Sequence, residues 1–210
     1  MTRKEFLKIC GLLGIIAPFN ASCITRSLLN NINNKFEGKV IIIGAGAGGL
    51  SAGYLLEQLG IDFEILEASS NFGGRMKINT NFADFPIPLG AEWIETKCEI
   101  FSEILNDDSV CLDIKTIKDS PDHKFVNSSW YNFYEMYIVP RILEKIAFNS
   151  IVKTIDYSEE KISISTSQGL KVADKVIVSV PLKVLQVGDI EFIPVLSKNK
   201  QSVIKNAQIW

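Results

Sequence analysis

The residues best suited to chemistry in this sequence form a glycine-rich run, Gly44-Ala45-Gly46-Ala47-Gly48-Gly49. A phosphate is stabilised at the first turn of a helix by unpaired amide groups and by the helix dipole, provided that the backbone comes close. Gly44 suits a sharp turn, Gly46 leaves room for a pyrophosphate, and Gly49 lets a helix approach the preceding strand. The run therefore predicts a dinucleotide site, against the alternative of a glycine turn that binds nothing.

An acidic residue, Glu67, follows at the spacing at which such a site holds its ribose. Its carboxylate can accept hydrogen bonds from the ribose hydroxyls, and it would repel a 2′-phosphate. Both FAD and NAD present a pyrophosphate and an adenosine ribose, so these residues alone leave the two cofactors open.

A second glycine pair, in Phe72-Gly73-Gly74-Arg75, favours FAD over NAD. Two flexible residues suit a further close approach of the backbone, and the guanidinium of Arg75 suits a phosphate contact. An isolated arginine is more often a solvated surface residue, which is the alternative for Arg75.

The elements that must position these residues follow from hydrophobic periodicity. Val40 to Ile43 is a continuous apolar run, typical of a strand buried on both faces of a parallel sheet. Apolar residues recur at helical spacing from Leu50 to Leu59 and stop at Gly60, and a second strand is predicted from Ile61 to Leu66. This order predicts an α/β fold, a Rossmann-like FAD-binding βαβ domain with a reduced α+β second region.

The later elements are predicted from period and from turn residues. Helices are predicted at Glu99 to Leu105, at Trp130 to Phe148 with an interruption near Pro140, and at Val195 to Trp210. Lys118 to Ser129 is the clearest loop or domain boundary, and strands are predicted at 151–155, 162–165 and 175–178.

These predictions divide the chain into four parts. They are a signal peptide and linker at 1–34, an FAD-binding Rossmann-type region at 35–117, a helical insert or reduced substrate region at 118–148, and a strand-rich continuation of the FAD domain at 149–210.

From Val40 to Met76 the sequence resembles the flavin-containing amine oxidase family, which includes the monoamine and polyamine oxidases. Three further segments resemble the family in the same order: Leu89 to Ile94, Val152 with Ile155, and Lys175 to Leu185. The resemblance implies FAD as the cofactor, with the first segment beside the flavin and the second against the adenine. The residues predicted to bind the cofactor are Gly44, Ala45, Gly46, Ala47, Gly48, Gly49, Glu67, Ala68, Gly74, Arg75, Gly90, Ala91, Glu92, Trp93 and Val152.

The same resemblance implies an oxidoreductase in which the flavin takes a hydride equivalent from an amine-bearing carbon and oxygen reoxidises it. The expected substrate is a small molecule, with an amine as the first candidate. No residue is assigned as catalytic: His123 is the only histidine, and its polar loop is typical of solvated residues. Glu92 beside Trp93 suits either a place near the flavin or a loop salt bridge, and the aromatic residues from Trp130 to Tyr137 suit either a pocket or a core.

Family members are longer than this chain. Their C-terminal part supplies the last flavin contacts, much of the substrate pocket and a lysine near the flavin. A non-catalytic FAD-binding fragment that lacks the catalytic half is therefore one alternative. A related desaturase or isomerase that acts on an apolar polyene is another, because it would share the N-terminal fingerprint.

The composition is that of an ordinary globular protein, with 47% hydrophobic and 22% charged residues and a net charge of −2. Basic residues form no stripe that would hold a polyanion, so no nucleic acid is expected as a partner. The four cysteines show no spacing typical of a metal site or a redox dithiol, and no metal is predicted.

The N-terminus has the order of a secretory signal: basic residues, an apolar run from Cys10 to Phe19, and then small residues. A helix needs about 20 apolar residues to span a bilayer, so no transmembrane span is predicted. Thr2 to Lys8 resembles a twin-arginine export signal, and Asn20-Ala21-Ser22-Cys23 loosely matches a lipoprotein site. We expect an exported, periplasmic protein, with a cytoplasmic protein as the alternative.

Overall fold

The computed structural model describes residues 36–84, 87–95, 98–105, 107, 110, 112–118 and 122–208. The predicted signal peptide and linker at 1–34 lie outside these residues, and export stays a prediction. Within the described part of the chain, no helix has both the length and the apolar character needed to cross a membrane.

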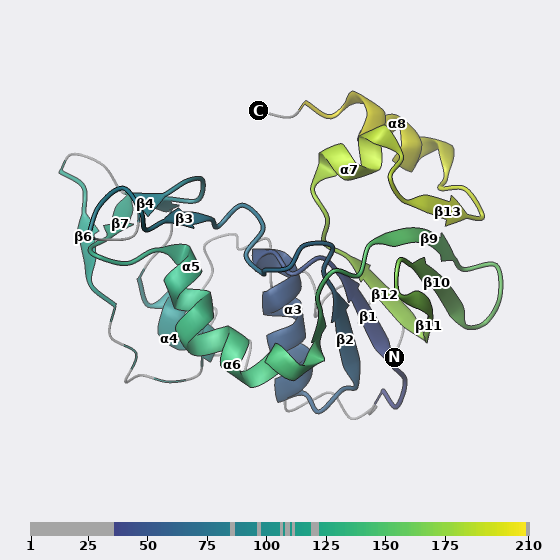
Figure 1. The fold of residues 1–210 in the computed structure, drawn as a ribbon, viewed down its shortest axis with the longest axis horizontal. Helices are drawn as coiled ribbons and strands as arrows, with labels where there is room; N and C mark the ends of the chain where they lie inside the picture. The colour runs from purple at the N-terminus through teal and green to yellow at the C-terminus, as the bar shows by residue number, and fades with distance from the viewer. Residues whose placement is uncertain are drawn as a thin grey trace.

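A four-stranded parallel sheet forms the centre of the fold (Figure 1). Its strands stand in the order β12 (Lys175–Val178), β1 (Val40–Ile43), β2 (Phe63–Leu66) and β8 (Ile146–Ala147). All neighbouring strands run parallel. Helix α3 (Ala47–Gln58) connects β1 to β2 and completes the predicted βαβ unit. The predicted Rossmann-like α/β class is confirmed.

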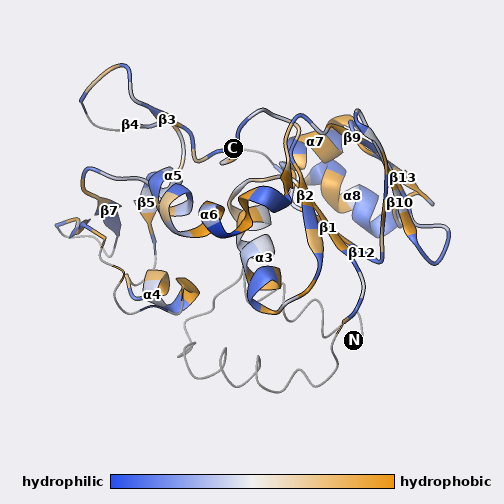
Figure 2. Ribbon diagram, turned by 60° about the horizontal axis from the view of Figure 1, so that its bottom comes forward, coloured by the Kyte–Doolittle hydropathy of each residue, from blue (hydrophilic) through white to orange (hydrophobic). Residues whose placement is uncertain are grey.

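Strand β1 is buried on both faces because each face packs on a different layer. Val40 and Ile42 belong to the core on the helix side, whereas Ile41 and Ile43 belong to the core on the opposite side. Burying each such side chain contributes about 1.5–3 kcal/mol, which explains why this run contains no polar residue. Figure 2 shows hydrophobic residues gathered in β1 and β2.

Helix α3 and a longer helical stretch cover one face of the sheet (Figure 1). The stretch runs through α5 (Trp130–Phe133), the π-helical η1 (Tyr134–Ile138) and α6 (Val139–Ile142), and it packs on α3. Gly53 permits this packing, because a Cβ there would lie 2.8 Å from Cδ1 of Ile65 and 3.5 Å from Cδ1 of Ile142.

The predicted end of this helical stretch at Phe148 is wrong. After α6 the chain makes one 3-10 turn, η2 (Leu143–Lys145), and enters β8. The interruption predicted near Pro140 is present as a change of helix type: η1 ends at Ile138 and α6 begins at Val139, with Pro140 in its first turn, where a missing N–H costs little. The wider π-helical turn before it makes room for the proline ring.

A second sheet covers the opposite face of the parallel sheet (Figure 1). Its order is β11 (Gly169–Ala173), β10 (Ile162–Thr166), β9 (Val152–Asp156) and β13 (Glu191–Ile193), and only the β13–β9 pair is parallel. Val152, Ile155 and Ile164 form the second core together with Ile41 and Ile43. The predicted strands at 151–155, 162–165 and 175–178 are confirmed to within a residue or two.

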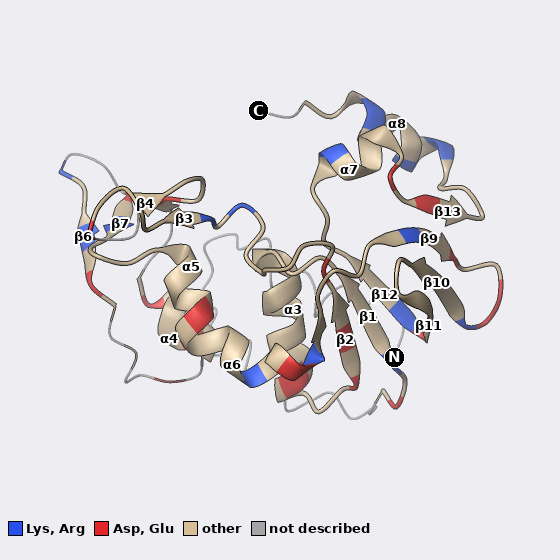
Figure 3. Ribbon diagram, viewed as in Figure 1, with Lys and Arg blue, Asp and Glu red and all other residues tan. Residues whose placement is uncertain are grey.

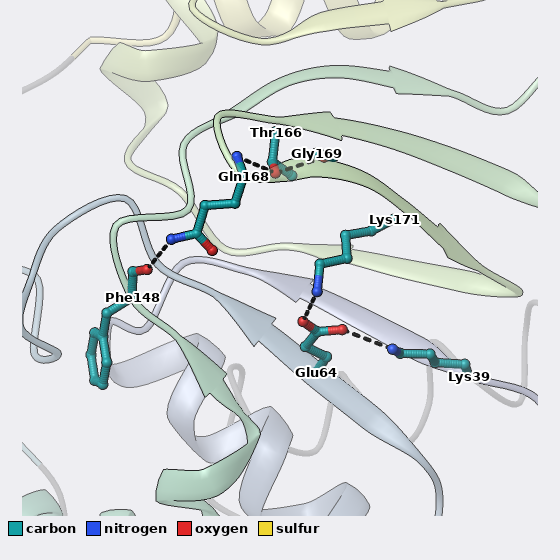
Figure 4. Close-up of polar contacts among 7 residues, drawn as sticks. All are labelled: Lys39, Glu64, Phe148, Thr166, Gln168, Gly169 and Lys171. Carbon is teal, nitrogen blue, oxygen red and sulfur yellow. Dashed lines mark hydrogen bonds and ion pairs between the residues drawn. The ribbon is translucent and has the colours of Figure 1, made fainter.

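Polar side chains also join the two sheets (Figure 4). Glu64 on β2 accepts hydrogen bonds from Nζ of Lys39 at 2.7 Å and from Nζ of Lys171, on β11, at 2.5 Å. Burial acts to raise the pKa of Glu64, but the hydrogen bonds and charges of Lys171 and Lys39 outweigh it and lower that pKa. Nearby, Nε2 of Gln168 donates to the carbonyl of Phe148 at 2.9 Å. The Glu64–Lys171 contact thus links β2 of the parallel sheet to β11 of the second sheet.

Short strands and one helix form a corner between β2 and α5. β3 (Ile78–Asn79) pairs with β4 (Ile87–Pro88), and β7 (His123–Phe125) lies between β5 (Trp93–Ile94) and β6 (Ile114–Thr116). Helix α4 (Ile100–Leu105) confirms the predicted helix there. The predicted loop at 118–129 is wrong over β7, because pairing with β5 stabilises a strand too short to leave a pattern.

Aromatic side chains fill this corner. The ring of Phe101 lies 5.7 Å from that of Phe125, 5.3 Å from that of Trp130 and 4.9 Å from that of Phe133, measured between centroids. We call these four residues the aromatic corner. The aromatic residues of the helical stretch therefore serve a core, at least at Trp130 and Phe133.

Two helices end the described chain. Helix α7 (Leu182–Val187) ends at Gly188, which has φ 78°. Helix α8 (Lys198–Asn206) begins later than predicted because Ser197 caps it, with its hydroxyl accepting from the amide of Lys200. Lys and Arg are interspersed with Asp and Glu along the ribbon (Figure 3).

Candidate functional site

The candidate site lies where the parallel strands end. Gly44 follows β1, Glu67 follows β2, and Ser179 follows β12. The amide of Gly44 donates to the carbonyl of Leu66 at 2.8 Å, and the amide of Ser179 donates to the carbonyl of Ile43 at 2.9 Å. The carboxyl edge of a parallel α/β sheet is the place at which such folds bind ligands.

Backbone atoms crowd two glycines of the loop. Gly44 has φ 101°, and a Cβ there would lie 2.9 Å from the carbonyl oxygen of Ser179. A Cβ on Gly49 would overlap the carbonyl oxygen of Gly44. Gly44 thus makes the sharp turn, and Gly49 lets α3 approach β1 as closely as the sequence pattern requires.

The third glycine of the pattern faces open space. No described atom lies within 4 Å of the Cβ position of Gly46, which is the N-cap residue of α3. Within the described chain no side chain caps this helix, and its first turn contains no acidic residue. The first-turn amides therefore have no intrahelical acceptor and can bind an anion.

Glu67 lies against the loop through its carboxylate. Oε2 accepts from the amide of Ala45 at 2.6 Å, and Oε1 accepts from the amide of Ser69 at 2.9 Å and from the Ser69 hydroxyl. These bonds fix the orientation of the carboxylate, and its remaining lone pairs can still accept from another donor. The ribose contact of Glu67 and the role of exposed Ala68 stay predictions.

The Gly73–Gly74 turn lies beside the glycine loop. The amide of Gly73 donates to the carbonyl of Ala45 at 2.8 Å, and a Cβ on Gly74 would lie 3.3 Å from Cα of Gly46. The following guanidinium, that of Arg75, is exposed and has no partner among the described residues. The structure thus brings the two predicted glycine segments together and leaves a cation beside them.

The segment at 89–94 lies alongside this turn. The amide of Ala91 donates to the carbonyl of Arg75 at 3.4 Å, and a Cβ on Gly90 would overlap that same carbonyl oxygen. Glu92 forms a 2.6 Å ion pair with Lys124, whose Nζ lies 3.9 Å from the centroid of the Trp93 ring. Of the two alternatives for Glu92, the loop salt bridge is therefore present.

Val152, the first residue of β9 in the second sheet, differs from the other predicted residues. Its side chain is buried in the second core, packed with Ile155. The connection to the site runs through the backbone, because the amide of Ser150 donates to the carbonyl of Glu67 at 2.8 Å. An adenine contact by Val152 stays a prediction.

The described residues show no catalytic pair. His123 lies on β7, away from the glycine loop, and its Nδ1 lies 3.1 Å from Oγ1 of Thr116. No group of three or more metal-ligating side chains is found in the described part of the chain. A role of the predicted site residues in cofactor binding stays a prediction, and no residue is assigned as catalytic.

Two contributions to the site were not predicted from the sequence. Ser179 closes one side of the loop: its Oγ lies 2.9 Å from the Cβ position of Gly48. Ser179 directly follows a predicted strand of the parallel sheet, and this position could have indicated a place at the site. The stacking of Tyr131 on Phe72 beside Gly73 had no local signal.

The residues present fit a dinucleotide such as FAD. Among the described residues, the uncapped helix start and the open backbone at Gly46 leave space and donors for a pyrophosphate, and Arg75 adds an exposed cation. Glu67 would hold the ribose, as predicted.

Comparisons with known proteins point to the same cofactor. Residues 42–107 match the NAD(P)-binding Rossmann-like domain, and residues 139–209 match the flavin containing amine oxidoreductases.

Individual relatives match over shorter segments. Polyamine oxidase 1 of Zea mays is 50% identical over 58 residues, which are 27% of this chain and 11% of that protein. Lysine-specific histone demethylase 1B of Mus musculus is 39% identical over 72 residues, 31% of this chain and 9% of that protein. The 4,4'-diapolycopene oxygenase of Methylomonas sp is 32% identical over 104 residues, 50% of this chain and 20% of that protein.

The chain thus spans a fifth or less of the length of these three relatives in the aligned segments. The two family matches nevertheless cover both ends of the described chain, and they follow the order of the motifs around Gly44, Glu67 and Lys175. Together these matches relate the chain to the flavin-containing amine oxidoreductases and imply FAD as the cofactor.

Proposed function

We propose that this chain binds FAD at the glycine loop and serves a flavoenzyme that oxidises amines. The observation that carries the proposal is the start of α3 at Gly46, which has no side-chain cap among the described residues and faces open space. The Gly73–Gly74 turn and Ser179 lie on either side of this glycine loop. The match of residues 139–209 to the amine oxidoreductases supports the choice of chemistry.

In the proposed complex the first-turn amides of α3 and the guanidinium of Arg75 neutralise the pyrophosphate. Glu67 accepts hydrogen bonds from the ribose hydroxyls while Ala45 and Ser69 hold its carboxylate in place. Bound FAD would supply the oxidation, accepting a hydride equivalent from an amine-bearing carbon and passing the electrons to oxygen.

The substrate class is proposed from the relatives. Polyamine oxidases of Zea mays and Oryza sativa are among the proteins that short segments of this chain resemble, as are two lysine-specific histone demethylases or homologues. The names of these enzymes refer either to polyamines or to lysine, and both carry amino groups. We therefore propose a small-molecule amine as the substrate.

The test pairs binding with turnover. The purified chain is titrated with FAD, and hydrogen peroxide is then measured over a panel of polyamines and monoamines. We expect a yellow protein that releases peroxide with at least one amine. A colourless protein that takes up no FAD would contradict the proposal, and bound flavin without turnover would favour a non-catalytic FAD-binding protein.

Gly46→Val tests the site itself. The new side chain would enter the space that the structure leaves open, so FAD binding should be lost although the apoprotein remains folded. Gly60→Ala is a control at the opposite end of α3: the space around it is open, and the left-handed φ of 64° costs an added Cβ about 1–2 kcal/mol of stability without reaching the site. Normal flavin occupancy in Gly46→Val would refute the assignment of the loop.

A second candidate function is the oxidation of an apolar polyene. It is favoured by the length of the alignment to the 4,4'-diapolycopene oxygenase, which reaches half of this chain. Incubation of the FAD-loaded chain with an apolar polyene, followed by chromatography of the products, separates the two functions. If the polyene is converted and no amine leads to peroxide, the proposed substrate would be the polyene and not an amine.

We also propose export to the periplasm, which is supported by the order of basic, apolar and small residues at the N-terminus. Cell fractionation of the tagged chain, compared with a variant in which Arg3 and Lys4 are replaced by Gln, tests this. Equal cytoplasmic retention of both proteins would contradict export.

A further inference from the structure

An aromatic pair connects the helical insert to the Gly73–Gly74 turn. The rings of Phe72 and Tyr131 stack with their centroids 4.8 Å apart and their planes 6° apart. Phe72 directly precedes the turn, whereas Tyr131 belongs to α5. The pair therefore joins two segments that are far apart in the sequence.

Tyr131 also lies against the turn itself. A Cβ on Gly73 would lie 3.1 Å from Cδ2 of Tyr131 and 3.2 Å from Cε2. Gly73 and Gly74 have φ 108° and 55°, conformations that glycine adopts readily but also leaves readily. Because ordering two such residues costs entropy, a side-chain contact from outside the turn adds to the backbone hydrogen bonds that hold its conformation.

The turn is in direct contact with the glycine loop. The amide of Gly73 donates to the carbonyl of Ala45 at 2.8 Å, Gly46 and Gly73 form a parallel bridge, and Arg75 follows the turn directly. A change in the turn would therefore displace one wall of the pyrophosphate site and the cation beside it.

We propose that the Phe72–Tyr131 stack is a positioning element of the FAD site. Helix α5 holds the turn on the glycine loop, so that a residue of the helical insert sets the affinity for the pyrophosphate. The inference rests on the proposed FAD site. Tyr131 acts through the turn and is a positioning residue.

The experiment measures the dissociation constants of FAD and of adenosine for the full-length apoprotein. We expect Tyr131→Leu and Phe72→Leu each to weaken FAD binding about tenfold, the size of effect that loss of a packed aromatic pair can produce. Adenosine, which lacks the pyrophosphate, should bind as it does to the wild type. Tyr131→Phe keeps the ring and should restore FAD affinity to within about twofold of the wild type.

Tyr137→Leu is the control on the same helical stretch. Tyr137 contacts Phe133, with ring centroids 5.7 Å apart, and is remote from the turn along the helix. Its FAD affinity should equal that of the wild type. Thermal unfolding of each apoprotein shows whether a variant is folded, and if Tyr131→Leu is not, the Phe72→Leu and Tyr131→Phe variants decide.

Two outcomes would overturn the positioning role: wild-type FAD affinity in the folded leucine variants, or an equal loss of adenosine and FAD affinity, which would indicate a general structural defect. A wild-type chain that binds no FAD would instead overturn the proposed function and the positioning role together. Binding by the wild type therefore separates the two failures.

Discussion

In the glycine loop the contacts that fix the geometry are made by backbone atoms, whereas in the aromatic corner they are made by side chains. A Cβ on Gly44 or Gly49 would meet a carbonyl oxygen. Phe101 is instead surrounded by three aromatic rings at centroid distances of 4.9–5.7 Å. Backbone contacts leave no alternative residue, whereas apolar side chains can be exchanged for others of similar volume.

The largest effect is expected from Gly49→Val in the glycine loop. The added side chain would overlap the carbonyl oxygen of Gly44 and force α3 away from β1, at a cost of about 3 kcal/mol or more. Urea unfolding of the apoprotein measures this loss. Gly60→Ala, at the other end of the helix, is the control, and equal stability of the two variants would break the comparison.

Glu67→Ala is expected to act on binding. Removal of the charge-assisted hydrogen bonds to the ribose should cost about 1.5–3 kcal/mol of FAD affinity. Isothermal titration with FAD gives the value, and Glu57→Ala, on the surface of α3, is the matched control. An unchanged dissociation constant would remove Glu67 from the site.

A pH-dependent effect of intermediate size is expected from Glu64, where charged side chains join the two sheets. Its pKa is lowered in the folded protein, so its contribution is present above its unfolded pKa of about 4.3 and is lost as the pH falls through the lower, folded value. Glu64→Gln should cost about 1 kcal/mol at pH 7, because partial exposure of the two lysines weakens the pairs.

Urea unfolding of the wild type and Glu64→Gln at pH 7 and near pH 3 checks this prediction. The difference between the two proteins should shrink on acidification. A difference that stays constant with pH would show that the carboxylate charge is not responsible.

In the aromatic corner we expect an effect no larger than that of Glu64→Gln. Phe101→Leu should cost about 1 kcal/mol, since an apolar side chain of lower volume still fills most of the site. FAD affinity should not change. A loss as large as that of Gly49→Val would show that this corner is as tightly constrained as the loop.

The same contrast explains what the sequence could predict. The run from Val40 to Gly60 carries a buried strand, a glycine pattern and a helical period, all of them local, and each was located correctly. β7 and β8 have three and two residues and depend on partners far along the chain, so they leave no period. The π-helical turn before Pro140 depends on packing against α3, which a single stretch of sequence does not reveal.

The residues of the candidate site likewise fall into those that the sequence predicts and those that it does not. The glycines were predicted from their own spacing, since the backbone conformation they permit is a property of the residue. The contacts of Ser179 and Tyr131 arise only when distant segments meet. The pairing of Glu92 with Lys124 likewise depended on β5 and β7 forming a sheet.

The pairing of β2 with β8 has a consequence for how this protein can change. The amide of Glu67 donates to the carbonyl of Ala147 at 2.9 Å, and the amide of Ser150 donates to the carbonyl of Glu67 at 2.8 Å. The segment between β2 and β8 therefore leaves the parallel sheet after one strand and returns to it at the neighbouring strand. Because closing a longer loop costs little more than closing a shorter one, the loops of this segment can change in length, provided that η1 and α6 keep their packing on α3 and the Gly73–Gly74 turn keeps its contact with the glycine loop.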